Sequence, residues 1–137
     1  NQKALDVAVD ATINPITNFM IGYPQENYES IMASVNFWTK NNIRCKPFFI
    51  TPFPMTQLFE EQKQKILAQF NNSLEEYVLS LGEATDLHVN LTRYSDPELI
   101  GIQELMSKHD VERLKKWHNL FYPVGELARE SNPEELK

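Results

Sequence analysis

The apolar residues in the first part of the chain fall into alternating helical and extended runs. Residues 3–12 carry apolar side chains at helical spacing, and Asn14-Pro15 ends this pattern because a proline ring cannot continue a helix. Residues 17–21 form a short β-branched and apolar run, which predicts a buried strand. The spacing over 27–40 is helical again, with an apolar face made of Tyr28, Ile31, Met32, Val35 and Trp38.

A second extended run follows this helix. Residues 43–53 are mostly apolar and are broken by prolines, and Phe48 to Thr51 is their most strand-like part. A strand, a helix and a strand at this spacing form a βαβ unit with a right-handed crossover. We therefore predict that 17–21 and 47–51 are adjacent parallel strands, with the helix at 27–40 packed across them.

The remainder of the chain is predicted to be helical. Thr56, Ser73, Ser95 and Asp110 each precede a run of apolar residues at helical spacing, and each can cap the helix that follows. The stretch from Ser73 to Glu76 has the pattern of a capping box, and its helix is expected to end at Gly82.

Composition and charge exclude several classes of function. The chain of 137 residues is 42% hydrophobic and 23% charged, as in ordinary globular proteins, and its formal net charge is −6. Apart from Arg113 to Lys116 it has no cluster of basic residues, which argues against nucleic acid as a partner. No apolar run approaches the roughly 20 residues of a membrane span.

The cysteine and the histidines of the chain are weak candidates for catalysis or metal binding. The single cysteine, Cys45, excludes an internal disulfide and a cluster held by cysteines of this chain alone, and it is compatible with a reducing cytosol. We interpret Cys45 as a half-buried core residue, since nothing nearby in the sequence would activate it. The histidines at 88, 109 and 118 do not have the spacing of a metal site. We predict no catalytic residue and no metal ligand in this chain.

The two segments that follow the predicted strands are candidate binding segments, because ligands of parallel α/β proteins gather at such strand ends. The first reads Gly22-Tyr23-Pro24-Gln25-Glu26, and the second begins Thr51-Pro52-Phe53-Pro54-Met55-Thr56. Both lead into helices on the same side of the sheet, so we expect them to face one ligand edge. Taken singly, the first is typical of an ordinary turn and the second of a rigid linker.

Taken together, these segments resemble the late strands of the radical SAM superfamily. The resemblance is strongest to the cobalamin-associated branch of oxygen-independent cyclase and methylase-like enzymes. It is carried by Gly-Tyr-Pro-x-Glu, an amphipathic helix, and Phe-Phe-Ile-Thr-Pro-Phe-Pro-x-Thr-x-Leu-Phe. The stretches from Leu79 to Leu87 and from Tyr94 to Leu99 also look like the C-terminal extension of such proteins. The similarity spans most of residues 1–120.

The resemblance implies a binding role for both turns. In the family the first turn seats the adenine and ribose of S-adenosylmethionine, and the second lies against the adenine. The family's turn glutamate corresponds to Glu26, which we expect to be structural or to orient the turn. The implied cofactor-binding residues of this chain are Met20, Ile21, Gly22, Glu26, Phe49, Ile50, Thr51 and Pro52.

Three departures from the family pattern bear on this role. Gln25 and Met55 stand where the family usually has glycine, and both would be strained if those positions require a positive φ. The Cys-x-x-x-Cys-x-x-Cys loop that holds the [4Fe–4S] cluster in the superfamily is absent. The intact family uses that cluster and S-adenosylmethionine, sometimes with cobalamin, for radical chemistry. The isolated chain is therefore expected to bear no cofactor and to be inactive.

The fold class that follows is α/β, a βαβ fragment of a radical SAM (partial TIM-type) barrel with a C-terminal helical extension. We place the last βα units at 1–70, the helical extension at 71–122 and a loose acidic tail at 123–137. The expected function is the C-terminal fragment of a cytoplasmic radical SAM Fe–S oxidoreductase-like enzyme, contributing part of the S-adenosylmethionine pocket and of the barrel wall. The alternative is a self-contained small α/β binding or assembly module without enzymatic activity.

The expected partner of the chain is the remainder of the barrel in the parent protein. A homodimer of the fragment is a second expectation, because two parallel strands leave an edge open to pairing. We expect Phe19 or Met20, with Phe49 or Ile50, to be exposed at that sheet unless the helices of 56–121 cover them.

Overall fold

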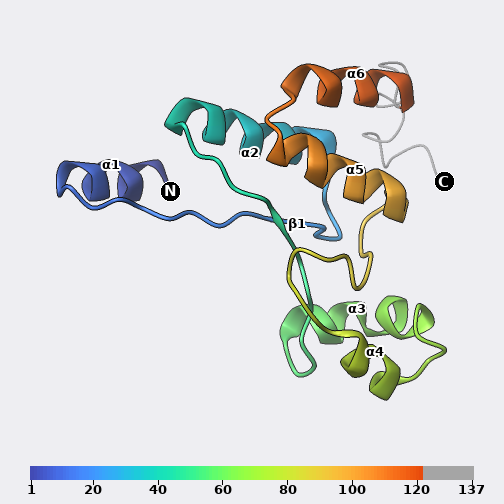
Figure 1. Cartoon of the computed structure of the whole chain (residues 1–137). Helices are drawn as coiled ribbons and strands as arrows, with labels where there is room; N and C mark the ends of the chain where they lie inside the picture. Colours follow the sequence, from blue (N-terminus) through green and yellow to red (C-terminus); the bar gives the residue numbers. More distant parts are fainter. Residues whose placement is uncertain (122–137) are drawn as a thin grey trace, which may run out of the picture.

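The computed structural model describes residues 1–121, with side chains to residue 118. Six helices and two short strands occur in this part of the chain (Figure 1). In order they are α1 (Gln2–Asp10), β1 (Met20–Ile21), α2 (Tyr28–Asn41), β2 (Phe48–Phe49), α3 (Gln57–Ala68), α4 (Leu74–Ser80), α5 (Asp96–Ser107) and α6 (Val111–Phe121).

The expected fold class is wrong. The described chain is mostly helical, and each strand has only two residues, so it is not a βαβ fragment of a radical SAM barrel with a helical extension. The prolines give the physical reason for the short strands. Pro47 precedes β2 and Pro52 follows it closely, and neither has an N–H for a longer ladder.

The predicted pairing of the two extended runs is nevertheless confirmed. β1 and β2 are parallel, with Met20 opposite Phe48 and Ile21 opposite Phe49. The N–H of Phe48 donates to the carbonyl of Phe19, and that of Ile50 donates to Ile21, both at 2.8 Å. The helix between them, α2, packs on these strands as predicted.

The two edges of this strand pair differ. On the far side of β2, the N–H of Phe49 donates to the carbonyl of Ala84 at 2.8 Å, so the segment between α4 and α5 occupies that edge. β1 has β2 as its sole strand neighbour within residues 1–121. Met20 is 52% exposed there, whereas Phe49 is buried, so only part of the expected apolar exposure occurs.

The main core joins the strands to three helices that are far apart in sequence. Figure 1 shows α2, α5 and α6 gathered on one side of the strand pair, with α3 and α4 on the other. Trp38 of α2, at 1% exposure, is among its largest buried side chains, and Phe19 meets it edge-on with ring centroids 4.7 Å apart. The buried members of this core are Ile21, Ile31, Val35, Trp38, Phe49, Tyr94, Leu99, Ile102, Met106 and Leu114.

A second core lies under α3 and α4. Its buried residues are Phe59, Ile66, Tyr77, Val89 and Leu91. Both cores combine residues from before and after position 70, and the domain boundary at that position stays a prediction. The tail predicted at 123–137 lies outside the described residues.

Local capping signals explain where several helices begin. The side chains of Thr56, Ser73 and Asp110 accept hydrogen bonds from the N–H three residues later. The carboxylate of Glu98 accepts from the N–H of Ser95 at 2.7 Å, at the start of α5. The prediction that α4 ends at Gly82 is wrong, because Leu81 already takes an extended conformation (φ −68°, ψ 136°).

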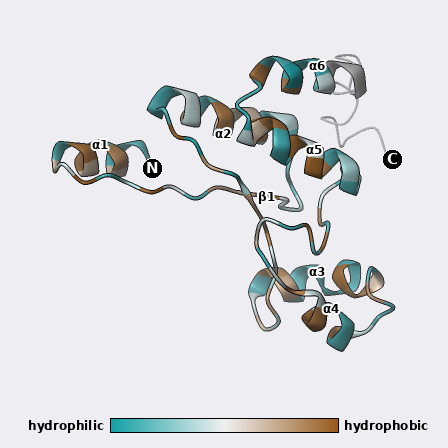
Figure 2. Cartoon of the chain, viewed as in Figure 1, coloured by the Kyte–Doolittle hydropathy of each residue, from teal (hydrophilic) through white to brown (hydrophobic). Residues whose placement is uncertain are grey.

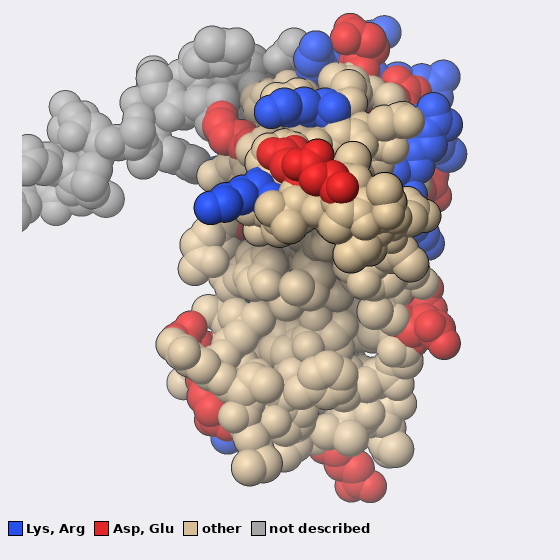
Figure 3. Space-filling model, turned by 90° about the vertical axis from the view of Figure 1, so that its left-hand side faces the viewer, with Lys and Arg blue, Asp and Glu red and all other residues tan. Residues whose placement is uncertain are grey.

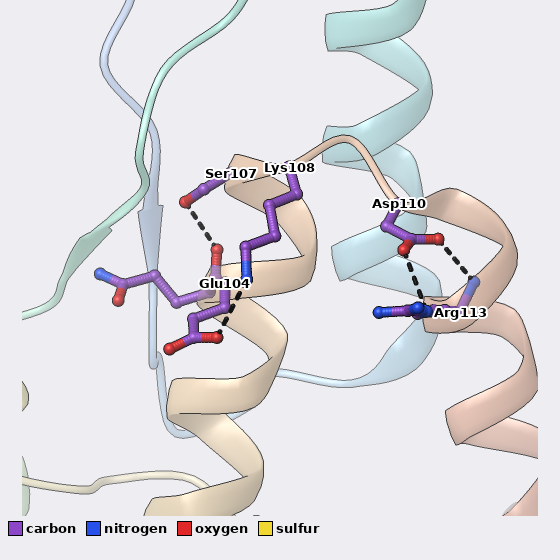
Figure 4. A network of polar contacts seen from close by, with 6 residues as sticks. Glu104, Ser107, Lys108, Asp110 and Arg113 are labelled. Atoms are coloured by element: carbon purple, nitrogen blue, oxygen red, sulfur yellow. Dashed lines mark hydrogen bonds and ion pairs between the residues drawn. The ribbon is translucent and has the colours of Figure 1, made fainter.

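The charged surface between α5 and α6 consists of local pairs. Figure 4 shows Lys108 beside Glu104 at 3.4 Å and Arg113 beside Asp110 at 3.4 Å. Such exposed pairs contribute little to stability. Both hydrophobic and hydrophilic residues occur along these helices (Figure 2). None of the described helices is long and apolar enough to cross a membrane.

Candidate functional site

The first turn is held by its own glutamate. The N–H of Glu26 donates to the carbonyl of Tyr23 at 2.9 Å, which closes a turn with Pro24 at its second position. The Glu26 carboxylate accepts from the N–H of Gly22 at 3.2 Å and from the hydroxyl of Ser30. Glu26 therefore fastens the end of β1 to the start of α2, an arrangement suited to a residue that orients the turn.

The second turn is closed by the same kind of hydrogen bond but has a different backbone conformation. The N–H of Thr56 donates to the carbonyl of Phe53 at 3.1 Å, and Pro54 again holds the second position. Met55 has a φ of +72°, which is the type II form that favours glycine at the third position. Gln25, the corresponding residue of the first turn, has no positive φ and so fits the type I form. The strain anticipated for both residues occurs at Met55 alone.

The two strand ends lie in contact. Gly22 is buried and has a φ of +100°, which side chains rarely adopt. A Cβ at this position would lie 3.3 Å from Cγ2 of Ile50, so the absence of a side chain allows the first turn to approach the second strand. The ends of the two strands are therefore close together, but the expectation that both turns lead into helices on the same side of the sheet is wrong, because α2 and α3 lie on opposite sides of the strand pair (Figure 1).

An open hollow of about 300 Å³ lies on the strand pair beside the second turn. This volume is at the lower end of the roughly 300–1,000 Å³ typical of small-molecule pockets. Phe53, which is 59% exposed, gives it a freely accessible aromatic wall. Its lining combines β1, the end of β2 and a distant segment: Met20, Phe48, Phe49, Ile50, Thr51, Phe53, Leu81, Gly82 and Ala84.

Four of the eight residues implied by the resemblance line this hollow, namely Met20, Phe49, Ile50 and Thr51. The other four are Ile21, Gly22, Glu26 and Pro52, and they do not line it. Ile21 belongs to the main core at 2% exposure. The carbonyl of buried Pro52 accepts a 2.5 Å hydrogen bond from the hydroxyl of Tyr77, which anchors the second turn on α4.

The hollow also contains residues that the sequence did not indicate. Phe48 and Phe53 belong to the same apolar run as the predicted residues, and this proximity in the sequence is the signal that could have found them. Leu81, Gly82 and Ala84 enter through the long-range hydrogen bond from Phe49 to Ala84. No local sequence pattern predicts this hydrogen bond.

The described part of the chain brings no set of metal-binding side chains together. Residues 1–121 hold no group of three or more His, Cys, Asp or Glu side chains that could bind a metal ion. Cys45 is partly buried, as predicted. Burial raises the pKa of its thiol, against a lowering contribution from a hydrogen bond with the backbone of Phe19. The donor set therefore does not fit a [4Fe–4S] cluster.

Comparisons with protein-family models, with curated proteins and with solved structures found no match to this chain.

Proposed function

We propose that the hollow at the ends of β1 and β2 binds the adenine side of S-adenosylmethionine, as one part of a larger radical SAM enzyme. The observation that supports the proposal is one hollow on the strand pair, four of whose lining residues are those implied by the resemblance. The iron–sulfur cluster of such an enzyme would be held by cysteines other than Cys45, and we assign this chain no catalytic step.

The chemistry of the hollow suits a flat, largely apolar base. Met20, Ile50 and Phe53 offer apolar surface, and Phe53 is exposed enough to stack on a ring. Thr51 is the one lining residue with a polar side chain, and its hydroxyl donates to the carbonyl of Phe49 at 3.4 Å, a distance that leaves it free to turn toward a ligand. When bound, S-adenosylmethionine would supply the reactive group, while these residues would bind and orient its base.

Nuclear magnetic resonance of the ¹⁵N-labelled chain tests this proposal directly. S-adenosylmethionine and adenosine, each added to about 5 mM to detect millimolar dissociation constants, are expected to shift the amide signals of Met20, Ile50 and Thr51. Methionine at the same concentration should not shift them. Phe53→Ala should weaken the response, whereas Ile100→Ala, an exposed apolar change on α5, should leave it intact. Absent shifts, or equal shifts with methionine, would overturn the proposal.

The same proposal includes a cytoplasmic location and a longer parent protein. The single cysteine and the lack of disulfides suit a reducing cytoplasm, where we place the enzyme. An upstream Cys-x-x-x-Cys-x-x-Cys in the same reading frame would support the enzyme and exclude the alternative of a self-contained binding or assembly module. That alternative is favoured by one observation, the open edge of β1.

A further inference from the structure

The outer edge of β1 is an unused set of backbone hydrogen-bonding groups. The carbonyls of Phe19 and Ile21 point toward β2. Successive residues of a strand direct their backbone groups to opposite edges, so the N–H and C=O groups of Asn18 and Met20 point away from β2. No hydrogen bond joins the backbone of Asn18 or Met20 to another part of residues 1–121. A strand placed alongside would satisfy these groups.

The side chains along this edge alternate in the same way. Ile16, Asn18 and Met20 are exposed, and the residues between them are partly buried. Ile16 is 89% exposed and Met20 is 52% exposed, so two apolar side chains stand on one face at either side of Asn18. Alternation over this length marks 16–20 as an extended segment that one more strand could continue.

The edge itself carries no charge. Residues 11–25 contain no Asp, Glu, Lys, Arg or His, although charges are the usual means by which natural edge strands prevent association. Figure 3 views the molecule from the side of α1, and the middle of that face carries no charged side chain. A groove of about 500 Å³ lies between α1 and residues 15–20, and Tyr23 and Phe37 also line it.

We propose that this edge pairs antiparallel with the same edge of a second copy of the chain, about a twofold axis at Asn18. A second copy is favoured because the edge is self-complementary. With Asn18 opposite Asn18, Ile16 of one copy lies opposite Met20 of the other, so both apolar side chains meet apolar partners. Asn18, Ile16 and Met20 all direct their backbone groups outward in this register, so each opposed pair exchanges two hydrogen bonds.

The register makes a specific crosslinking prediction. Opposed residues of a hydrogen-bonded antiparallel pair have Cα atoms about 5.5 Å apart, within the roughly 4.4–6.8 Å that a disulfide spans. In a Cys45→Ser background, Asn18→Cys is therefore expected to form a disulfide-linked dimer under mild oxidation. Ile16→Cys and Met20→Cys, whose counterparts are not opposite themselves, should crosslink far less.

Sedimentation equilibrium at micromolar concentration supplies the second measurement. The chain is expected at twice its 16.0 kDa mass. Ile16→Lys or Met20→Lys should raise the dimer dissociation constant at least about tenfold, because lysine on an edge strand opposes pairing. Matched controls on α4, Leu79→Lys at 77% exposure and Val78→Lys at 45%, should leave it unchanged. A monomer throughout, equal loss in the α4 controls, or equal crosslinking at positions 16, 18 and 20 would overturn the proposal.

Met20 takes part in both proposals, but Ile16 does not line the hollow, so Ile16→Lys separates the dimer from the proposed function. Failure to dimerise leaves adenosine binding at the strand ends untested, and failure to bind adenosine leaves the edge of β1 unchanged. A monomeric chain whose edge accepts a strand from a different protein would count against the second copy as the occupant.

Discussion

Replacing Met55 by glycine tests how the second turn is built. Met55 occupies the third position of a turn closed by the hydrogen bond from Thr56 to Phe53, with a φ of +72°. A residue with a Cβ in this left-handed region costs roughly 1–2 kcal/mol. Met55 is 93% exposed, so the substitution removes almost no packing. Glycine relieves the strain and in return loses about 0.5–1 kcal/mol through the greater freedom of the unfolded chain.

The two terms leave Met55→Gly with a net gain of between about 0 and 1.5 kcal/mol in the free energy of unfolding, with a central value of ~0.75 kcal/mol, or about 2–4 °C in the thermal midpoint. Urea denaturation followed by circular dichroism measures it, and an unchanged m value shows that the unfolded state is comparable.

Gln25→Gly is the matched control for this change. Gln25 is exposed and occupies the same position after the proline of the first turn, but its φ is not positive. Glycine there relieves no strain and adds only freedom to the unfolded chain, so stability is expected to fall by about 0.5–1 kcal/mol. The two substitutions should therefore act in opposite directions. If Met55→Gly left the protein no more stable, or if both changes shifted stability in the same direction, the assignment of strain to the second turn would be wrong.

Three further predictions concern Tyr77, Cys45 and iron. Tyr77→Phe leaves the buried carbonyl of Pro52 without its partner and should lower the free energy of unfolding by about 1–2 kcal/mol in urea melts. Burial raises the pKa of Tyr77, so above about pH 10 the unfolded phenol ionises before the folded one. Wild-type stability should therefore decline there more steeply than that of Tyr77→Phe, and parallel pH profiles would contradict this. Cys45, partly buried with a raised pKa, should react with a disulfide reagent at pH 8 at least about tenfold more slowly in the native chain than in urea; equal rates would refute it. Anaerobic reconstitution should yield no stoichiometric cluster, and about four irons per chain would contradict that expectation.

The sequence determined most of the local structure. The helical spacing of apolar residues and the caps at Thr56, Ser73 and Asp110 depend on residues only a few positions apart, and the helices begin where these signals predict. The parallel pairing of the two extended runs was also predictable, because a strand, a short helix and a strand connect in few ways.

The lining of the hollow was predictable in part for the same reason. Met20, Phe49, Ile50 and Thr51 meet at the hollow because they are close to the ends of strands that local patterning had already identified. The inward position of Ile21 and the anchoring of Pro52 by Tyr77 were not predictable from either turn alone.

Only the tertiary structure decided how far the strands extend and what surrounds them. The ladder stops after two residues in each strand, α5 and α6 fill the core over α2, and Ala84 takes the outer edge of β2. Gln25 and Met55 each follow a proline but differ in φ, and the tertiary structure decided this difference as well. Each depends on contacts between segments far apart along the chain, and such contacts leave no periodic or capping signal in the residues that make them.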